Sequence, residues 1–442
     1  MNRRLRQERS YLRFWVLFAA LSAMIFVRYG LQIGIPRVLA LVPVVVIALL
    51  GDKTELIAIC MCLIPFHESL DFYYALVLVI AIYVFKNFRQ IRINASFFLM
   101  LLMVLWELLH CLAGDFSPVT FVVSLLPIIA LVVFLCSDFS DLDYPFVVRA
   151  VAAAAMVVCV TMLVQLLWIS RFNLAAFFAN LRRLGALSEQ SADRLQLSGG
   201  LVQTNSLGVI CVLITATLLQ LRFSGQSKRS DTYVMLTLLI FGTFTASRTF
   251  LVCLALMIFL VLMGQKGVVK KLRYLGIAIL ALGFLVLLFS IFFTEQLEYY
   301  VSRFFEADIT TGRDDLMVVY HRFITENMNV LFFGVGLQDY GDKLVNHYRV
   351  ANNVPHNSIQ EIVIAWGIPG LVLISALILL LLYQAYRKMG RRKLINYIPV
   401  IIILFKSMAG QLLTSNYSIL ALAFGYLNLI QDLNEDPKRI KQ

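Results

Sequence analysis

The sequence predicts an all-α protein, a polytopic bundle of transmembrane helices with a large loop outside the membrane. Of its 442 residues 60% are hydrophobic and only 14% are charged, whereas soluble domains are about 45–50% apolar and about 25% charged. The mean hydropathy is +0.83, and the apolar residues fall in runs of membrane-spanning length. Lys and Arg gather between these runs, so we interpret the net charge of +12 as topology rather than nucleic-acid binding.

Fourteen apolar runs are candidate spans, each compared with the ~20 residues that cross a bilayer. The third and fourth runs are short and are either two spans or one re-entrant pair, which gives twelve to fourteen spans. Both counts are even, so both termini lie on the same side. The runs are 11–29, 36–51, 54–66, 70–85, 95–113, 118–136, 145–170, 199–221, 232–246, 249–264, 273–293, 357–386, 396–412 and 415–431.

Six basic clusters fix the orientation of these spans. Alternating spans place all six on one side, and the positive-inside rule makes that side the cytoplasm. The first run, Trp15–Val27, lacks a small-residue cleavage site and predicts a retained span. The seven cysteines lie in apolar runs without CxxC spacing, so neither disulfides nor zinc are indicated. The clusters are Arg3–Arg13, Lys86–Arg92, Arg222–Arg229, Lys266–Arg273, Arg387–Lys393 and Lys438–Lys441.

Two long hydrophilic segments then fall outside the membrane, at 171–198 and 294–356. The longer one contains a helical pattern that predicts an amphipathic helix over 313–328, lying on the membrane face or over a cavity. Gly334-Val335-Gly336 predicts a turn. No internal repeat marks a second domain, so we expect one integral-membrane domain over 1–442.

Arg248 is the single charged residue between Thr232 and Met263, and the predicted topology places it at an outer turn. An unpaired Arg in lipid costs at least ~2.5–3.5 kcal/mol on insertion scales. A guanidinium matches phosphate oxygens bidentately, so Arg248 is a candidate anion clamp. The alternatives are that it reaches lipid headgroups or pairs with a carboxylate such as Glu361.

Other cations of the outer segments are weaker candidates. Arg182 and Arg183 lie beside Phe177 and Phe178, and with Arg194 they either grip a charged glycan or face lipid headgroups from an interfacial helix. Arg313 opens the predicted loop helix, where it forms a second anion site or a solvated pair with a neighbouring Asp.

His356 stands where the large loop meets the next span, on the same face as Arg248. Histidine titrates near neutrality and can take a proton from a sugar hydroxyl, although a lone loop histidine is often a bystander. His347 and His356 with nearby acids match no standard metal-binding spacing. Glu107, His110 and Lys406 are ionisable residues inside spans. Such residues are typical of proton-coupled transporters, so a transporter remains an alternative function.

The chain resembles the O-antigen ligase and polymerase family over about residues 195–385 in five short motifs. They are Ser198 to Gly208, Ser247-Arg248-Thr249, Gly312-Arg313-Asp314, Phe333 to Leu337, and His356-Asn357-Ser358 followed by Glu361 and Gly367-Ile368-Pro369-Gly370.

The resemblance implies a metal-independent, cofactor-independent glycosyltransferase of the GT-C type in the bacterial cytoplasmic membrane. It would use glycan carried on undecaprenyl diphosphate at the outer face and transfer it with inversion to a glycan or lipid acceptor. Carried over by motif, Arg248 and Arg313 hold the diphosphate and His356 is the base. Further candidates for substrate contact are Asn205, Tyr340, Asn357 and Glu361.

Two activities within that family are open. A polymerase joins lipid-linked repeat units, with a chain-length regulator as a candidate partner, and a ligase moves a finished chain onto lipid A–core or another acceptor. The Gly-Arg-Asp form and the loop length favour the O-antigen or capsule polymerase. A flippase for lipid-linked oligosaccharide is the alternative from another class, but flippases usually carry inverted repeats and short loops.

Overall fold

The described residues form an all-α membrane bundle, as the sequence predicts. The computed structural model describes residues 2–112, 116–177, 203–245, 247–292, 294, 301, 313–338, 340–349, 355–389 and 394–430. Over these residues the secondary structure is helical apart from one isolated bridge between Ile91 and Ser137.

Each of the fourteen predicted spans contains a helix, and further short helices form the outer loop. Seven of the described helices are long and apolar enough to cross a membrane, and four other apolar helices are shorter. The helices are α1 (Asn2–Ile25), α2 (Arg37–Leu50), α3 (Lys53–Cys62), α4 (Phe72–Asn87), α5 (Ala95–Leu112), α6 (Pro118–Cys136), α7 (Tyr144–Ile169), α9 (Thr204–Phe223), α10 (Arg229–Phe244), α11 (Arg248–Gly264), α12 (Val268–Phe292), α14 (Arg313–Glu326), α15 (Met328–Phe332), α16 (Tyr340–Asp342), α17 (Ser358–Met389), α18 (Ile398–Met408) and α19 (Ser418–Ile430).

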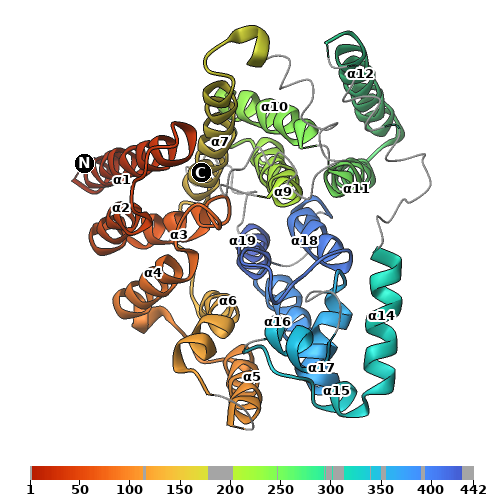
Figure 1. Cartoon of the computed structure of the whole chain (residues 1–442). Helices are drawn as coiled ribbons and strands as arrows, with labels where there is room; N and C mark the ends of the chain where they lie inside the picture. Colours follow the sequence, from red (N-terminus) through yellow and green to blue (C-terminus); the bar gives the residue numbers. More distant parts are fainter. Residues whose placement is uncertain are drawn as a thin grey trace.

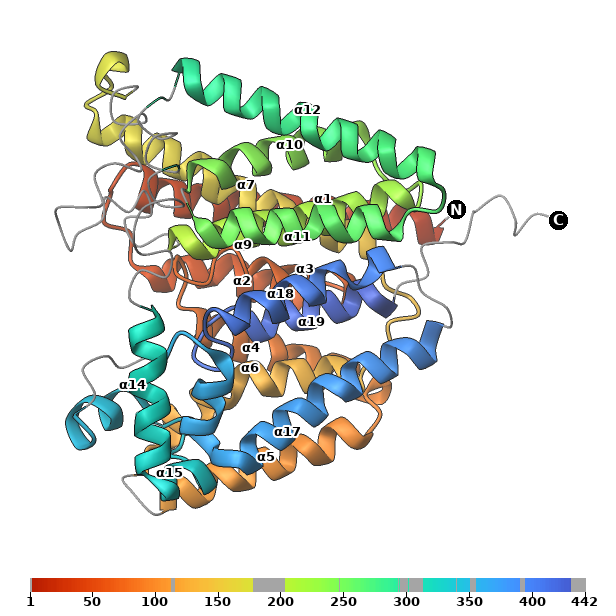
Figure 2. The same ribbon diagram turned by 90° about the vertical axis from the view of Figure 1, so that its right-hand side faces the viewer.

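The spans run roughly side by side, and α14 crosses one end of them (Figures 1 and 2). α19 is enclosed by the bundle and packs against α6, α17 and α18, while α9 packs against α7, α10, α11 and α18. Figure 2 shows the start of α1 and the ends of α17 and α19 at one end of the bundle, with α14 and α15 at the other. We call the end that carries α14 the loop end.

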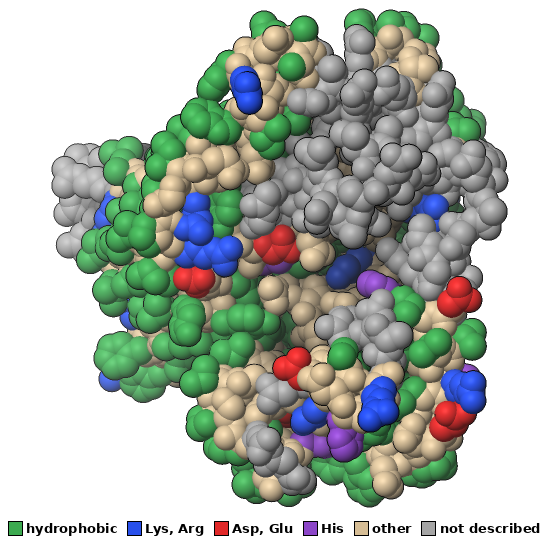
Figure 3. Space-filling view, viewed as in Figure 1, with side chains coloured by type: hydrophobic (Ala, Val, Ile, Leu, Met, Phe, Trp, Pro, Cys, Tyr) green, Lys and Arg blue, Asp and Glu red, His purple; other side chains and the backbone are tan. Residues whose placement is uncertain are grey.

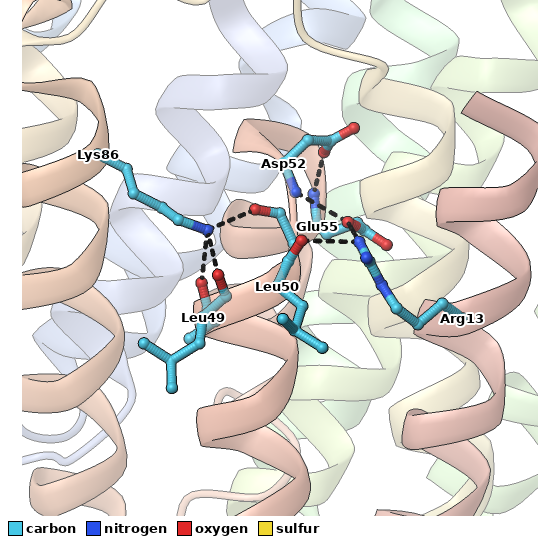
Figure 4. Close-up of polar contacts among 8 residues, drawn as sticks. Arg13, Leu49, Leu50, Asp52, Glu55 and Lys86 are labelled. Carbon is cyan, nitrogen blue, oxygen red and sulfur yellow. Dashed lines mark hydrogen bonds and ion pairs between the residues drawn. The ribbon is translucent and has the colours of Figure 1, made fainter. Parts of the chain in front are cut away.

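Basic side chains at the opposite end close the ends of helices. Arg13 bonds to the Leu50 carbonyl at 2.8 Å and to Glu55 at 3.1 Å, as Figure 4 shows. Glu55 also completes a capping box with Asp52 at the start of α3. Lys86 closes the end of α2, where carbonyl groups have no partners within the helix. It donates to the carbonyls of Ala48, Leu49 and Gly51 at 3.1, 2.7 and 2.8 Å.

The short third run forms a half-length helix rather than a full span. α3 has ten residues, which is about 15 Å of helix against a hydrocarbon core of about 30 Å. The chain turns at 63–71 and returns as α4. α18 and α19, with 11 and 13 residues, form a second short pair. α4, together with residues 88–90, is long and apolar enough to cross a membrane, so only α3 of the first pair is short.

Candidate functional site

The segments that carry the candidate residues converge at the loop end of the bundle. They are the starts of α9, α11 and α17, the loop helix α14, and the turn 409–417 between α18 and α19. Figure 3 shows this face hollowed near its centre, with acidic, basic and histidine side chains in and around the hollow. Charged and histidine side chains are therefore gathered near the centre of the loop end.

Arg248 is placed by tight packing at the start of α11. Ser247 caps the helix by accepting a hydrogen bond from the Phe250 N–H at 3.3 Å. The Phe250 side chain fills space that a side chain would otherwise need on two neighbouring helices, since a Cβ on Gly208 would lie 2.8 Å from the Phe250 Cβ and one on Gly242 would lie 2.1 Å from the ring. The Ser-Arg-Thr segment is thus locked in position, and it leaves Arg248 half-buried at the loop end.

The start of α17 presents His356 and Asn357. The Asn357 side chain accepts from the N–H groups of Ile359 and Gln360 at 2.9 and 3.3 Å, which caps the helix. His356 is half-buried just before this cap. Its imidazole is therefore carried by a fixed helix start rather than by free loop.

Glu361 joins this helix start to the turn 409–417. Its carboxylate accepts from the N–H groups of Leu412, Leu413 and Thr414 at 2.7, 3.1 and 2.8 Å, and from the Thr414 hydroxyl. The Ser358 hydroxyl bonds to the carbonyl of Ser407 beside it. Glu361 is fully buried and is committed to this turn, so it does not pair with Arg248, an alternative that the sequence left open.

The helix α14 docks on α17 next to His356. Gln360 donates to the Met317 carbonyl at 2.9 Å. Arg313 is the first residue of α14. The predicted helix 313–328 ends at Glu326, because Asn327 leaves helical geometry before α15 begins.

Two tyrosines of the outer loop are buried, Tyr320 within α14 and Tyr340 in α16. Burial raises the pKa of Tyr320 to about 12 and that of Tyr340 well above its ordinary value. Both phenols therefore remain protonated donors at neutral pH. Neither hydroxyl has a hydrogen-bond partner among the described residues, and Tyr340 lies near the carboxylate of Glu361. Tyr340 is thus placed beneath the surface of the site.

The glycine motifs build the junction between the outer loop and α17. Gly334, Gly336 and Gly367 have φ of 84°, 84° and 65°, values that glycine adopts without strain. A Cβ on Gly334 would lie 2.4 Å from the Ala365 carbonyl oxygen. α17 breaks at Gly367, whose backbone is not helical, and Pro369 has no N–H, so carbonyl groups of the preceding turn lack helical partners. Those of Ile364 and Ala365 accept from the N–H groups of Val335 and Gly336, both at 2.8 Å.

Glu107 secures the same junction from α5. It accepts from the N–H groups of Leu337 and Gln338 at 2.9 and 2.8 Å, and from the Trp366 indole at 2.6 Å. His110 bonds to the Phe333 carbonyl at 2.8 Å. These intramembrane groups therefore hold the outer loop on the bundle.

Most, but not all, of the predicted site residues lie in the described part of the chain. Arg182, Arg183 and Arg194 lie outside the described residues. Asn205 is half-buried in the first turn of α9. Arg248, His356, Asn357 and Glu361 meet around the loop end. Among the described residues, no group of three or more His, Cys, Asp or Glu side chains can hold a metal ion.

The sequence reading missed two residues in the turn between α3 and α4. The rings of His67 and Tyr417 are in tilted contact, with centroids 4.7 Å apart, and Glu68 lies 3.5 Å from His67. The only signal in the sequence was a His-Glu pair between two short apolar runs. Its partner Tyr417 is 350 residues away, so no local pattern could reveal the contact.

Residues 232–375 match the family model described as O-antigen ligase. The matched segment contains Arg248, Arg313, His356, Glu361 and the glycine junction, and it coincides with much of the segment whose motifs resemble this family. No curated protein matches the chain. The chain thus combines an all-α membrane bundle with a segment, residues 232–375, that matches the O-antigen ligase family.

Proposed function

We propose that the protein is a polymerase that joins polysaccharide repeat units carried on undecaprenyl diphosphate at the outer face of the cytoplasmic membrane. The family domain supports transfer from a lipid-linked glycan to an acceptor. The observation that carries the proposal is the convergence of Arg248, His356 and the loop helix α14 at one end of a membrane bundle. This end would face outward, with both termini and the helix-capping cations in the cytoplasm.

In the proposed reaction the acceptor hydroxyl attacks the anomeric carbon of the donor sugar. A new glycosidic C–O bond forms, and the bond from that carbon to the diphosphate oxygen breaks on the opposite face, which inverts the configuration. The hydroxyl proton passes to neutral His356. Undecaprenyl diphosphate leaves with the electron pair, so no metal or cofactor enters the balance.

The charge that develops on the departing diphosphate sets the role of the arginines. Arg248 and Arg313 would neutralise it with fixed guanidinium groups, which stabilises the transition state. The rigid start of α11 favours this role for Arg248, because a positioned donor needs no reorganisation during reaction. Asn205 and Asn357 would contact the glycan or its carrier, Tyr340 would support the site from beneath its surface, and Arg182, Arg183 and Arg194 remain candidates. Glu361 would act by positioning the turn 409–417.

The loop over 294–356 would be the catalytic loop. α14 lies across the loop end and is tied to α17 beside His356 through Gln360. A helix in this place would exclude water, which otherwise competes with the acceptor. The polyprenyl tail would remain among the apolar helices.

A ligase that transfers a finished chain to lipid A–core or another acceptor is the second candidate within the family. It would use the same donor chemistry and differ only in the acceptor and in any chain-length regulator. The Gly312-Arg313-Asp314 form and the loop length favour the polymerase.

A flippase for lipid-linked oligosaccharide is less well supported by the contacts of the intramembrane ionisable groups. Glu107 and His110 bond to the outer loop. Lys406 donates to the Gln411 carbonyl at 3.2 Å and to the Ser418 hydroxyl at 2.9 Å. These groups thus serve as anchors of loops rather than as steps of a proton path.

Purified protein in liposomes with undecaprenyl-diphosphate-linked repeat units as the only substrate tests the proposal. A ladder of longer lipid-linked glycans is the expected result. Transfer only after lipid A–core is added would assign a ligase. Movement of the glycan across the bilayer without a new bond would refute glycosyl transfer and the roles given to Arg248 and His356.

A further inference from the structure

Two turns that no family motif covers form a joined polar platform within the bundle. One is 63–71 between α3 and α4, and the other is 409–417 between α18 and α19. Two contacts join them. The rings of His67 and Tyr417 are in tilted contact, and the Tyr73 hydroxyl donates to the Asn416 Oδ1 atom at 2.7 Å. The turn 63–71 follows the half-length α3, and the turn 409–417 lies between the short helices α18 and α19.

The platform is linked to the site described above at two points. Glu361, five residues after His356, holds the N–H groups of the turn 409–417. The Tyr417 hydroxyl lies beside Ser206, in the first turn of α9, and α9 touches the start of α11 at Gly208 and Phe250. The platform therefore lies next to the segments that carry His356 and Arg248.

Glu68 is the one partly exposed residue in a segment that is otherwise buried. Every residue from Thr54 to Leu70 is buried except Glu68, whose side chain is 23% exposed. A carboxylate inside a membrane bundle is costly and marks a functional site by default. His67 lies behind it and is only 4% exposed. The His67 Nδ1 atom bonds to the Ile64 carbonyl at 2.8 Å, which fixes the ring with Nε2 toward Glu68.

Asn416 supplies the complementary group. Its Oδ1 atom is occupied by the Tyr73 hydroxyl, and its Nδ2 group makes no hydrogen bond within the described residues. Thr414, Ser415 and Asn416 are all half-buried, so this turn is both polar and accessible. Glu68 can only accept hydrogen bonds when ionised, whereas the Asn416 Nδ2 group can only donate. A sugar hydroxyl does both, and a saccharide offers several.

We propose that Glu68 and Asn416 form a sugar-binding subsite, in which the Glu68 carboxylate accepts from one glycan hydroxyl and the Asn416 amide donates to a hydroxyl of the same saccharide. The inference rests on the proposed function for its ligand, a lipid-linked glycan. It assigns sugar recognition to the α3–α4 and α18–α19 turns, while Arg248 and Arg313 bind the diphosphate. His67 and Tyr73 are positioning residues that orient the two contacts.

The test compares two ligands on the full-length protein in nanodiscs. One is the lipid-linked repeat unit extracted from cells that lack the gene, and the other is undecaprenyl diphosphate without sugar. Glu68→Gln preserves size, and Asn416→Asp retains the acceptor for Tyr73 while removing the donor. Each should raise the Kd for the glycan-bearing lipid about tenfold to a hundredfold, as expected for hydrogen bonds with charged groups. The Kd for the sugar-free lipid should not change.

Controls separate this inference from the proposed function. Glu326→Gln, on the exposed face of α14, should leave both Kd values unchanged, and Arg248→Lys should weaken both ligands. Unchanged glycan binding in Glu68→Gln and Asn416→Asp would overturn the subsite, and so would equal weakening of both ligands, which indicates a structural role. If the wild-type protein binds glycan through Glu68 but never transfers it, the proposed function fails and the subsite stands.

A competition assay then assigns the subsite to donor or acceptor. Free repeat-unit oligosaccharide, which lacks the lipid, competes for the acceptor position of the wild-type protein. Loss of this competition in Glu68→Gln places the subsite on the acceptor, and retained competition places it on the donor sugar. Once the Kd measurements have established sugar binding, either result identifies which saccharide is bound.

Discussion

The Glu361 carboxylate accepts a hydrogen bond from the Thr414 N–H at 2.8 Å, across 53 residues of sequence. The Leu412 and Leu413 N–H groups converge on the same carboxylate. A single buried side chain thus links the helix start that carries His356 to the turn that carries Asn416 and Tyr417. Its role is to fix the relative position of two parts of the site.

Glu361→Gln should therefore destabilise the protein. The glutamine amide turns an N–H group toward backbone donors, which leaves buried donors unsatisfied and costs about 2–4 kcal/mol. The melting temperature in detergent should fall clearly, and transfer should fall with it. Glu326 is exposed and, within the described part of the chain, bonds to Arg322 alone, so Glu326→Gln is the matched control and should change little. An unchanged melting temperature for Glu361→Gln would contradict the anchoring role.

Gly334→Ala should prevent stable assembly of the loop junction. The new Cβ would meet the Ala365 carbonyl oxygen at 2.4 Å, at a φ of 84°. Strain and overlap together should cost more than about 3 kcal/mol. Gly276→Ala in α12, with nothing within 4 Å of its Cβ, is the control. Comparing monodisperse yield and melting temperature tests the prediction, and equal behaviour of both variants would refute it.

Arg248→Lys should keep the fold but lower kcat/KM about tenfold to a hundredfold. Lysine retains the charge and loses the planar fork that matches diphosphate oxygens. The size of the loss corresponds to one or two charge-assisted hydrogen bonds. Steady-state transfer with lipid-linked repeat units measures it. Wild-type kinetics in this variant would show that Arg248 meets lipid headgroups instead.

His356→Ala should insert normally and lose transfer by about 10²- to 10⁴-fold, the usual contribution of a general base. The half-buried position of His356 before the Asn357 cap makes large packing losses unexpected. Binding of sugar-free undecaprenyl diphosphate should persist in this variant. Near-normal turnover would exclude His356 as the base, whereas lost binding would point to a structural defect.

The predicted orientation can be measured with single cysteines. The seven native cysteines are buried, so background labelling should be low. Val345→Cys lies at the loop end and Val268→Cys at the opposite end, at sites that are 42% and 71% exposed. A membrane-impermeant maleimide should label position 345 on the outside of the cytoplasmic membrane and position 268 only after permeabilisation. The reverse pattern would invert the topology.

The helices and their approximate ends follow from local sequence. A backbone in lipid must satisfy its hydrogen bonds within each segment, so an apolar run of sufficient length determines a helix without reference to the rest of the chain. The shortness of the third run likewise anticipated the half-length α3. The Gly334-Val335-Gly336 turn was predictable because glycine adopts positive φ. The family motifs located Arg248 and His356 for the same local reason.

The tertiary structure decided which polar residues meet. Tyr73 and Asn416 are 343 positions apart, and Glu107 reaches Gln338 across 231. Such pairs depend on how helices pack, and apolar surfaces that pack equally well with many neighbours carry no signal of the pairing in the sequence. The sequence by itself therefore determined a membrane bundle with candidate arginines and a histidine. Packing determined that Glu361 and Glu107 anchor loops, and that the turn carrying Glu68 meets the turn carrying Asn416 and Tyr417.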